Sequence, residues 1–328
     1  MRRPSVLAFF VAGVPLLVLG QGVAAQHPAH RIGFISGGSP AGMATRVQAF
    51  RDGLRELGLV EGETIVIDFR WADGKDERLP GLARDLVREQ VRVIVTHGVQ
   101  ATLAAGAASR TIPVLCFTCG DLLSTGVVTS LNRPGGNITG LTSIHPETSG
   151  KRLELLKEML PGVRRVAVLH RPGNPVTEPE MKATRDAMEK LALLPLPAEV
   201  GDPSEMAAAF SAMTRDGAEA VVIISDAALH GRIAQIAALA KAHRLPAIAP
   251  WGAEFVRVGG LVGFGPDGLA IAQRAAGYLD RILKGAHPGD LPVEQPTKFE
   301  LVLNLATARE LGIEVPRSLL ARADELVE

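Results

Sequence analysis

Short apolar runs alternate with longer amphipathic stretches along almost the whole chain. Residues 31–36 form an apolar run that ends in a glycine-rich loop, and Val47, Phe50 and Leu54 then recur on one face of a predicted helix. Residues 64–71 instead alternate apolar and polar side chains, a pattern typical of a half-buried strand. Short strands that alternate with longer helices predict parallel sheets covered by helices.

The same pattern assigns the rest of the chain. Further strands are predicted at 91–95, 112–117, 138–142, 165–169, 196–200, 219–224, 246–250 and 259–264. Helices are predicted at 43–58, 77–89, 99–108, 146–160, 178–192, 203–213, 227–243 and 269–284. Residues 292–304 are expected to be extended, and the tail after them is expected to be helical.

The segments 31–117 and 165–251 show the same order of apolar and polar positions. Two similar β/α units, each too large for a solenoid repeat, predict two lobes that face each other. We therefore expect an α/β protein with two doubly wound parallel-sheet lobes. A cleft between such lobes is a natural place for a small molecule.

Three connections between the lobes would form a hinge, with bending expected near Gly140, Gly263 and Pro296. The expected lobes are residues 28–142 with 265–292 for the N-terminal lobe, and residues 143–264 with 293–328 for the C-terminal lobe.

Residues 1–25 have the pattern of a signal peptide. Arg2 and Arg3 give a positive start, residues 6–19 are almost entirely apolar, and residues 23–25 are small. A membrane anchor is the alternative, but the apolar run is shorter than the roughly 20 residues that span a bilayer. We expect cleavage after about Ala25 and a periplasmic protein.

Composition excludes several classes of function. Removal of residues 1–25 takes away two arginines and leaves 33 basic and 35 acidic residues, so no basic surplus exists for nucleic acid or anionic lipid. The eight histidines are scattered without the spacing of metal ligands. No cofactor, metal or nucleic acid is expected, and the chain is expected to be a monomer.

Cys116 and Cys119 form a C-F-T-C motif. A redox-active pair needs its first cysteine at a helix N-terminus, where the helix dipole lowers the thiol pKa. Here the motif continues the apolar run 112–117, and in an extended strand the two Cα atoms would lie ~10 Å apart, too far for a disulfide. A turn at Thr118 would allow the bond. The pair is interpreted as buried or locally bridged rather than catalytic.

The loop after the first strand is a candidate binding site. In open α/β sheets, ligands bind beyond the carboxyl ends of the strands, where free amides of the following helices hold anions. Gly37 and Gly38 let the backbone approach a ligand, and the neighbouring Ser36 and Ser39 supply hydroxyls. The alternative is that Ser39 only caps the helix beginning near Pro40.

Thr96, His97 and Gly98 follow the third strand, and Asp121 follows the fourth. His97 could donate a hydrogen bond to a ligand, although a solvated loop histidine fits the sequence equally well. Asp121 could bind an α-ammonium group through a charge-assisted hydrogen bond. An Asx turn or a helix cap is the alternative for Asp121.

The matching positions of the second unit are His170, Asn174, Ser225, Asp226 and Trp251. Asp226 is a second candidate acid for the cleft, and the Trp251 indole can stack on a ring or a cation. Packing at the lobe edge is the alternative for Trp251. With 10 Phe, 1 Tyr and 2 Trp in the chain, a strongly aromatic binding cage is not expected.

Three strings resemble hallmarks of a family of bacterial ABC-transporter substrate-binding proteins, which includes tryptophan- and tyrosine-binding periplasmic proteins. They are residues 133–140, 291–301 and 316–325. The resemblance covers essentially all of residues 31–328. It implies a two-lobed fold of the type I periplasmic-binding class, with the ligand held between the lobes and delivered to a membrane permease. The C-F-T-C motif and a loop at 226–231 without aromatic residues depart from the family pattern.

An enzyme is the competing class, but its motifs are missing. Residues 37–41 nearly match the hydrolase G-x-S-x-G turn, yet the last position is Ala41, and Pro40 removes an amide that the oxyanion hole requires. We therefore expect no catalysis. The expected function is capture of a small molecule, an amino acid or a related carboxylate, for an ABC importer. The alternative is a sensor protein that presents its closed form to a membrane receptor.

Overall fold

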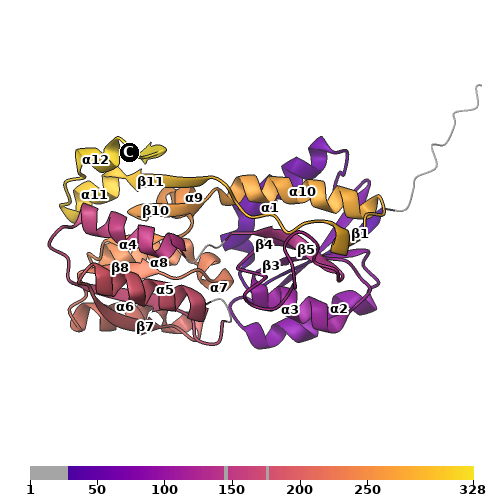
Figure 1. Ribbon diagram of the computed structural model, residues 1–328, viewed down its shortest axis with the longest axis horizontal. Helices are drawn as coiled ribbons and strands as arrows, with labels where there is room; N and C mark the ends of the chain where they lie inside the picture. The colour runs from indigo at the N-terminus through magenta and orange to yellow at the C-terminus, as the bar shows by residue number, and fades with distance from the viewer. Residues whose placement is uncertain (1–28, 144–146, 175–176) are drawn as a thin grey trace, which may run out of the picture.

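The computed structural model describes residues 29–328 except 144–146 and 175–176. The proposed signal peptide therefore lies outside the described residues. The described chain forms two lobes that lie side by side, with the C-terminus on the second lobe (Figure 1). No helix within this part of the chain combines the length and apolar character needed to cross a membrane.

The first lobe is built on a five-stranded parallel sheet with the strand order β2-β1-β3-β4-β5. Its strands are β1 (His30–Ser36), β2 (Ile65–Trp71), β3 (Val93–His97), β4 (Val114–Cys119) and β5 (Ile138–Thr142). Its helices are α1 (Pro40–Glu56), the short η1 (Asp76–Arg78), α2 (Leu79–Arg88) and α3 (Val99–Ala108).

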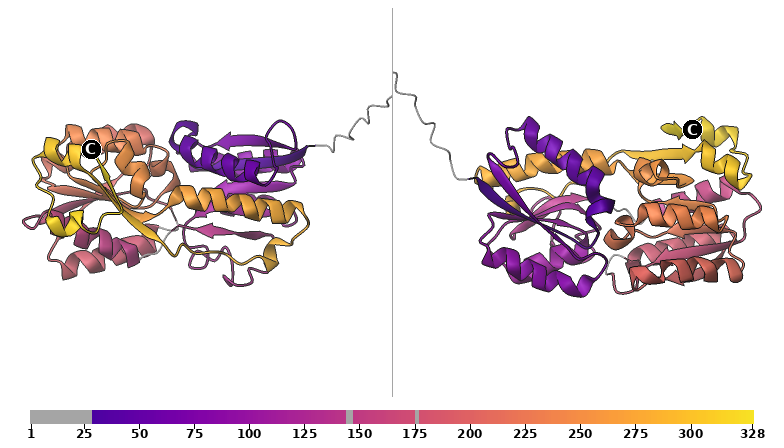
Figure 2. Two further views of the ribbon diagram at one scale, coloured as in Figure 1. Left: turned by 90° about the horizontal axis from the view of Figure 1, so that it is seen from above. Right: turned by 180° about the vertical axis from the view of Figure 1, so that it is seen from behind.

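A helix from late in the chain completes this lobe. Helix α10 (Gly268–Leu283) packs beside α1 on one face of the sheet (Figure 2). Phe34, Phe50, Phe117 and Tyr278 are buried together between these two helices and the strands. Helices α2 and α3 cover the opposite face with a second apolar cluster. The lobe thus has the three-layer arrangement that the sequence predicts.

The second lobe contains a seven-stranded sheet with the order β12-β11-β10-β9-β8-β6-β7. Its strands are β6 (Arg165–His170), β7 (Leu194–Glu199), β8 (Ala220–Ile223), β9 (Ala247–Ala249), β10 (Val262–Pro266), β11 (Phe299–Asn304) and β12 (Glu325–Val327). Its helices are α4 (Glu147–Met159), α5 (Thr177–Lys190), α6 (Met206–Arg215), α7 (Ala227–His230), α8 (Ile233–Ala242), α9 (Gly252–Arg257), α11 (Leu305–Leu311) and α12 (Arg317–Leu320). Short η2 (Pro203–Glu205) precedes α6, and η3 (Pro288–Asp290) follows α10.

The predicted repeat is visible in the strand orders. Strands β7-β6-β8-β9-β10 of the second lobe follow the same order as β2-β1-β3-β4-β5 of the first. The prediction of a two-lobed α/β fold is therefore confirmed.

The sheet of the second lobe is parallel except at one pair of strands. Strand β11 pairs antiparallel with β10. The chain leaves this lobe at the end of β10, forms α10 in the first lobe, and returns to the same edge of the second sheet (Figure 1). A strand that re-enters from that side must run in the opposite direction.

Other differences are local. The helix predicted at 227–243 is interrupted after Gly231, where Arg232 leaves the helical region with φ −131° and ψ 22°. Helix α9 is absent from the predictions, and the tail ends in β12 rather than in a helix. Both missed elements are short. Helix α9 has 6 residues, less than two turns, and β12 has 3 residues, so neither shows a periodic pattern of apolar residues.

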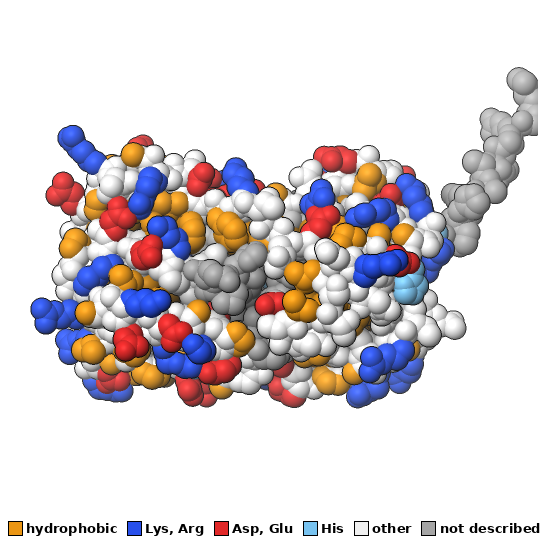
Figure 3. All heavy atoms as spheres, viewed as in Figure 1, with side chains coloured by type: hydrophobic (Ala, Val, Ile, Leu, Met, Phe, Trp, Pro, Cys, Tyr) orange, Lys and Arg blue, Asp and Glu red, His pale blue; other side chains and the backbone are white. Residues whose placement is uncertain are grey.

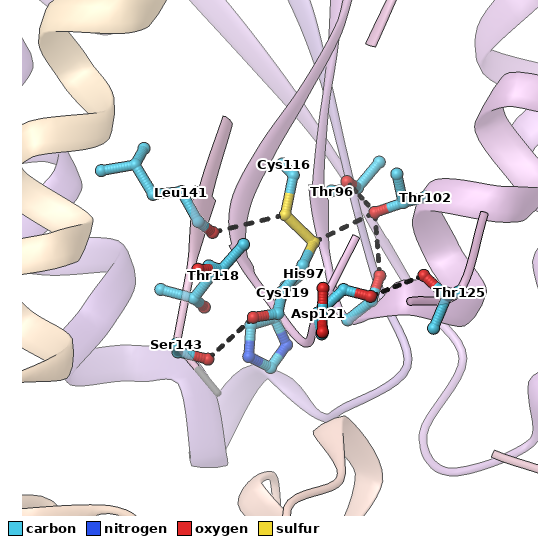
Figure 4. The surroundings of a disulfide bond; sticks show 12 residues. Thr96, His97, Thr102, Cys116, Thr118, Cys119, Asp121, Thr125, Leu141 and Ser143 are labelled. Atoms are coloured by element: carbon cyan, nitrogen blue, oxygen red, sulfur yellow. Dashed lines mark hydrogen bonds between the residues drawn. A yellow bond between two sulfur atoms is a disulfide. The ribbon is translucent and has the colours of Figure 1, made fainter. Parts of the chain in front are cut away.

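Cys116 and Cys119 form a disulfide with Cα atoms 6.0 Å apart (Figure 4). The register of β4 against β5 shifts between these two residues, so the strand is not fully extended there. The structure therefore bears out the locally bridged interpretation.

Gly140 and Gly263, the expected hinge glycines, lie inside β5 and β10. A Cβ at Gly140 would lie 2.1 Å from the Cys116 carbonyl oxygen, and one at Gly263 would lie 2.0 Å from the Gly252 carbonyl oxygen. Close packing of the backbone accounts for glycine at both positions.

Candidate functional site

The two sheets present the carboxyl ends of their parallel strands to each other, and a small cavity of about 40 Å³ lies between them. A notch between the lobes is visible in Figure 3. The first lobe lines the cavity with Arg46, His97, Gly98, Val99, Gln100, Thr118, Cys119 and Gly120, and Ser143 and Pro266 line it where the chain crosses between the lobes. The second lobe lines it with Asn174, Ser225, Asp226, Ala227, His230, Pro250 and Trp251.

Six of the sequence-predicted residues line this cavity, two from the first lobe and four from the second. They are His97, Gly98, Asn174, Ser225, Asp226 and Trp251. The rule that parallel strands place their carboxyl ends at one edge brings them together.

The loop after β1 does not line the cavity but holds the two lobes together. The Ser36 hydroxyl lies 3.0 Å from His97 Nδ1 and accepts a hydrogen bond from the Gly38 amide. Ser39 caps α1 and also donates a hydrogen bond of 2.9 Å to the carbonyl of Gly231 in the second lobe. Gly37 lies between these contacts, close to Ala227 of the second lobe. This loop is thus an interlobe contact.

Thr96 and Asp121 also lie outside the cavity lining. Thr96 is buried, and its hydroxyl is paired with that of Thr102 at 2.7 Å. Asp121 accepts hydrogen bonds from the amides of Leu123 and Ser124, and its carbonyl accepts one from Thr125 (Figure 4). The Asx-turn alternative therefore describes Asp121, and its carboxylate serves its own turn.

His170 is the remaining predicted residue outside the cavity. Its Nδ1 lies 3.1 Å from the Val168 carbonyl oxygen, and its Nε2 lies 3.6 Å from the Glu199 carboxylate. Both partners belong to the second lobe, so the ring is held at the end of β6 by its own lobe.

Sequence reasoning missed a buried ion pair at the centre of the interface. Arg46 of α1 donates to the carboxylate of Glu254 of α9 through three contacts of 2.6–3.0 Å, and its Nη1 donates to the Thr118 hydroxyl at 3.2 Å. The two side chains are 5 % and 6 % exposed. Burial acts to raise the pKa of Glu254, but the Arg46 guanidinium and His230 outweigh it and hold this pKa well below its usual range.

One signal for Arg46 was present in the sequence. Arg46 lies on the buried face of α1 with Met43, Val47 and Phe50, so a charge interrupts an otherwise apolar stripe. A cation on a core-facing stripe requires a buried partner. Glu254 had no such signal because it lies on the short helix α9.

Two histidines from opposite lobes meet beside this ion pair. The rings of His97 and His230 lie 5.6 Å apart, and Trp251 packs edge-on at 5.3 Å from His230. Burial lowers the pKa of both histidines, and the positive charge of Arg46 lowers both further. Both rings are therefore neutral near pH 7.

A second ionic contact crosses the interface at its edge. Arg171 of the second lobe lies 3.2 Å from the Asp76 carboxylate of the first lobe and 3.5 Å from that of Asp226, and it donates to the Gly74 carbonyl. Burial raises the pKa of Asp76 to about 6, against the opposing effect of Arg171. The lobes are thus in contact on both sides of the cavity.

The sequence profile of a family described as "ABC transporter substrate binding protein" matches residues 32–327. The chain belongs to this family. The resemblance seen in the sequence is therefore confirmed, and the family is one of substrate-binding proteins rather than of enzymes.

Several proteins and solved structures are similar to this substrate-binding protein over most of its length. A tyrosine-binding protein of Clostridioides difficile is 23 % identical over 267 residues, which are 81 % of this chain and 76 % of the relative. A conserved domain protein from Vibrio cholerae superposes with a TM-score of 0.82 at 28 % identity, covering 91 % of this chain and 99 % of the other. The ABC domain from Streptococcus pneumonia, solved in complex with L-Trp, also gives a TM-score of 0.82 at 24 % identity, covering 92 % and 100 %.

Proposed function

We propose that this substrate-binding protein captures a small carboxylate-bearing molecule, an amino acid or a related metabolite, between its two lobes and delivers it to an ABC importer. The observation that carries the proposal is the cavity to which both lobes contribute polar side chains at the carboxyl ends of their strands. The names of the tyrosine-binding relative and of the tryptophan complex support an amino acid or a related carboxylate as the ligand.

The residues proposed to contact the ligand combine predicted and newly found positions. They are His97, Gly98, Gln100 and Thr118 of the first lobe, with Asn174, Ser225, Asp226, His230 and Trp251 of the second. The loop Ser36–Ser39 is assigned the different role of joining the lobes when they close.

Closure around the ligand is the proposed mechanism. The cavity has room for a few water-sized groups, since one such position takes roughly 10–15 Å³. Ligand that bridges both lobes shifts the population toward the closed form, whose surface a permease would recognise.

The cellular setting follows from the N-terminal pattern and the family. A signal peptide at residues 1–25 would send the protein to the periplasm, where binding proteins of importers act. We further propose that the lobes divide at residues 142/143, 264/265 and 292/293, because the chain passes from one sheet to the other near each of these points.

A thermal-shift screen tests the function. Residues 26–328 are unfolded and refolded to strip co-purified ligand, then heated with amino acids, small carboxylates, purines and sugars. Ligand at 100 times its dissociation constant stabilises the folded protein by about 2.7 kcal/mol. A selective shift by carboxylates or amino acids is expected. A folded protein that responds to none of these compounds would contradict the proposal.

A further inference from the structure

The acidic groups at the cavity are already engaged within the protein. Asp226 accepts hydrogen bonds from the Ala228 and Leu229 amides at 2.7 and 2.9 Å, and from the Asn174 side chain at 2.8 Å. Glu254, behind Arg46, is held by that guanidinium. Asp226 Oδ1 also lies 3.5 Å from Arg171 Nη1, so among the described residues Asp226 and Glu254 are each already paired with an arginine.

Hydrogen-bond donors at the cavity are, in contrast, available. Helix α3 begins at the cavity with Val99 and Gln100, and its N-cap, Gly98, supplies no side-chain hydrogen bond to the first-turn amides. Gln100 Nε2 is buried and has no hydrogen-bond partner among the described residues. Amides at a helix N-terminus, together with its dipole, bind anions.

His230 adds an uncharged polar group opposite this helix. Its side chain is 1 % exposed, and its Nδ1 makes no hydrogen bond within the described part of the chain. Its Nε2 lies 3.3 Å from Glu254 Oε1, so a proton on Nε2 faces the carboxylate and leaves Nδ1 as an acceptor. A neutral imidazole nitrogen pairs well with a hydroxyl group of a ligand.

We infer that the cavity selects a carboxylate that carries a neutral hydrogen-bond donor, a 2-hydroxy acid, over the α-amino acid of the same size. The carboxylate lies at the N-terminus of α3 and Gln100, and the neutral group lies at His230. An ammonium group in the same place would be buried beside Arg46 without a free counter-charge, which costs far more than burial of a hydroxyl. This inference rests on the proposed function and narrows its ligand class.

Two matched sets of compounds test the selectivity by calorimetric titration of the refolded protein. The small set is L-lactate, L-alanine and ethylamine, and the large set is 3-(4-hydroxyphenyl)lactate, L-tyrosine and tyramine. In the set that binds, the hydroxy acid should bind at least about tenfold more tightly than the amino acid, a difference of about 1.4 kcal/mol, and the amine should not bind. An amino acid that binds as tightly as its hydroxy acid would overturn the inference and leave the proposed function standing. If neither set binds but a sugar or purine gives a thermal shift, the inference is also overturned. If no compound gives a thermal shift, both the inference and the proposed function are overturned.

A variant tests the position of the carboxylate. Gln100→Leu keeps the size of the side chain and removes the Nε2 donor, so it should weaken hydroxy-acid binding by about tenfold or more. Gln48→Leu is the matched control, because Gln48 is exposed on α1 and bonds only to Asp52 among the contacts described. Equal affinity of the Gln100→Leu protein and the wild type would overturn the assignment, provided that both melt at the same temperature.

Discussion

Arg46 and Glu254 are 208 residues apart in the sequence, yet the guanidinium of one is paired with the carboxylate of the other across the interface between the lobes. Both charges return to water when the lobes separate, so closure exchanges hydration for pairing. For a buried ion pair, the free-energy cost of removing both charges from water is similar in size to the gain from their attraction. The pair therefore determines the relative orientation of the closed lobes, while a ligand that bridges them determines the population of the closed form.

Removal of one charge from this pair should oppose closure. Glu254→Gln leaves the Arg46 guanidinium buried without a counter-charge, which costs about 3–5 kcal/mol in the closed form. Ligand affinity, measured by calorimetric titration, should fall at least about tenfold. The control is Glu325→Gln, which breaks the exposed pair with Arg257 and should change affinity little, since such pairs contribute about 0–1 kcal/mol. An unchanged affinity of Glu254→Gln would show that closure does not need the pair.

Gly42 sits where the two lobes come closest. A Cβ at Gly42 would lie 2.2 Å from the carbonyl oxygen of Gly231, so Gly42→Ala is compatible only with lobes that stand apart. We expect affinity to fall at least about tenfold, while the melting temperature of the ligand-free protein does not fall, because alanine favours a helix over glycine by about 0.5–1 kcal/mol.

Gly81 provides the matched control for this variant. It occupies the third position of α2, as Gly42 does of α1, and no atom lies within 4 Å of a Cβ built there. Gly81→Ala should leave affinity unchanged. Equal losses of affinity for the two variants would mean that the change from glycine to alanine in a helix, and not the close approach of the lobes, causes the loss.

Ligand affinity should depend on pH. In the closed form the pKa values of His97 and His230 lie below 6.5, so below about pH 6.5 the open form takes up protons that the closed form excludes. Affinity should therefore weaken as the pH falls from 7.5 to 5.5. Asp76 acts in the opposite sense, because its pKa rises from 3.8 to about 6 on burial and proton uptake between these values favours closure.

Asp76→Asn separates the two effects. The amide removes the proton uptake of Asp76, so the loss of affinity at acid pH should become steeper, while affinity at pH 7.5 does not fall. Titrations at pH 7.5, 6.5 and 5.5 measure both slopes. Tighter binding by the wild type at pH 5.5 would show that the two histidines do not control closure.

Asp121 should be dispensable for binding. Its carboxylate accepts two backbone amides of its own turn and lies outside the cavity lining. Asp121→Ala should lower the free energy of unfolding by about 0.5–1.5 kcal/mol, the usual worth of such hydrogen bonds, and leave affinity within about twofold of the wild type. A tenfold loss of affinity, with the melting temperature preserved, would restore Asp121 as a ligand contact.

The sequence predicts the lobes well because apolar periodicity and the internal repeat are properties of whole elements. Strand ends are predicted correctly for the same reason, and this placed His97, Asp226 and Trp251 at the cavity. Side-chain direction is not contained in that pattern. Asp121 and His170 lie at the ends of strands as His97 does, yet each turns to a partner in its own lobe.

The sequence also does not predict contacts between segments that are distant along the chain. The Arg46 charge on an apolar stripe indicated a buried partner, but no local pattern connects it to Glu254 on α9. The reversal of β11 also depends on where the chain re-enters the second lobe after α10, which a local pattern does not specify.

A crystal structure of the refolded protein with the compound that gives the largest thermal shift tests the central claim most directly. The account predicts the compound between the lobes, in contact with Gln100 on the first and with His230 or Trp251 on the second, and the Arg46–Glu254 pair formed. A compound bound to one lobe alone, or at another surface with the lobes unchanged, would contradict capture by closure.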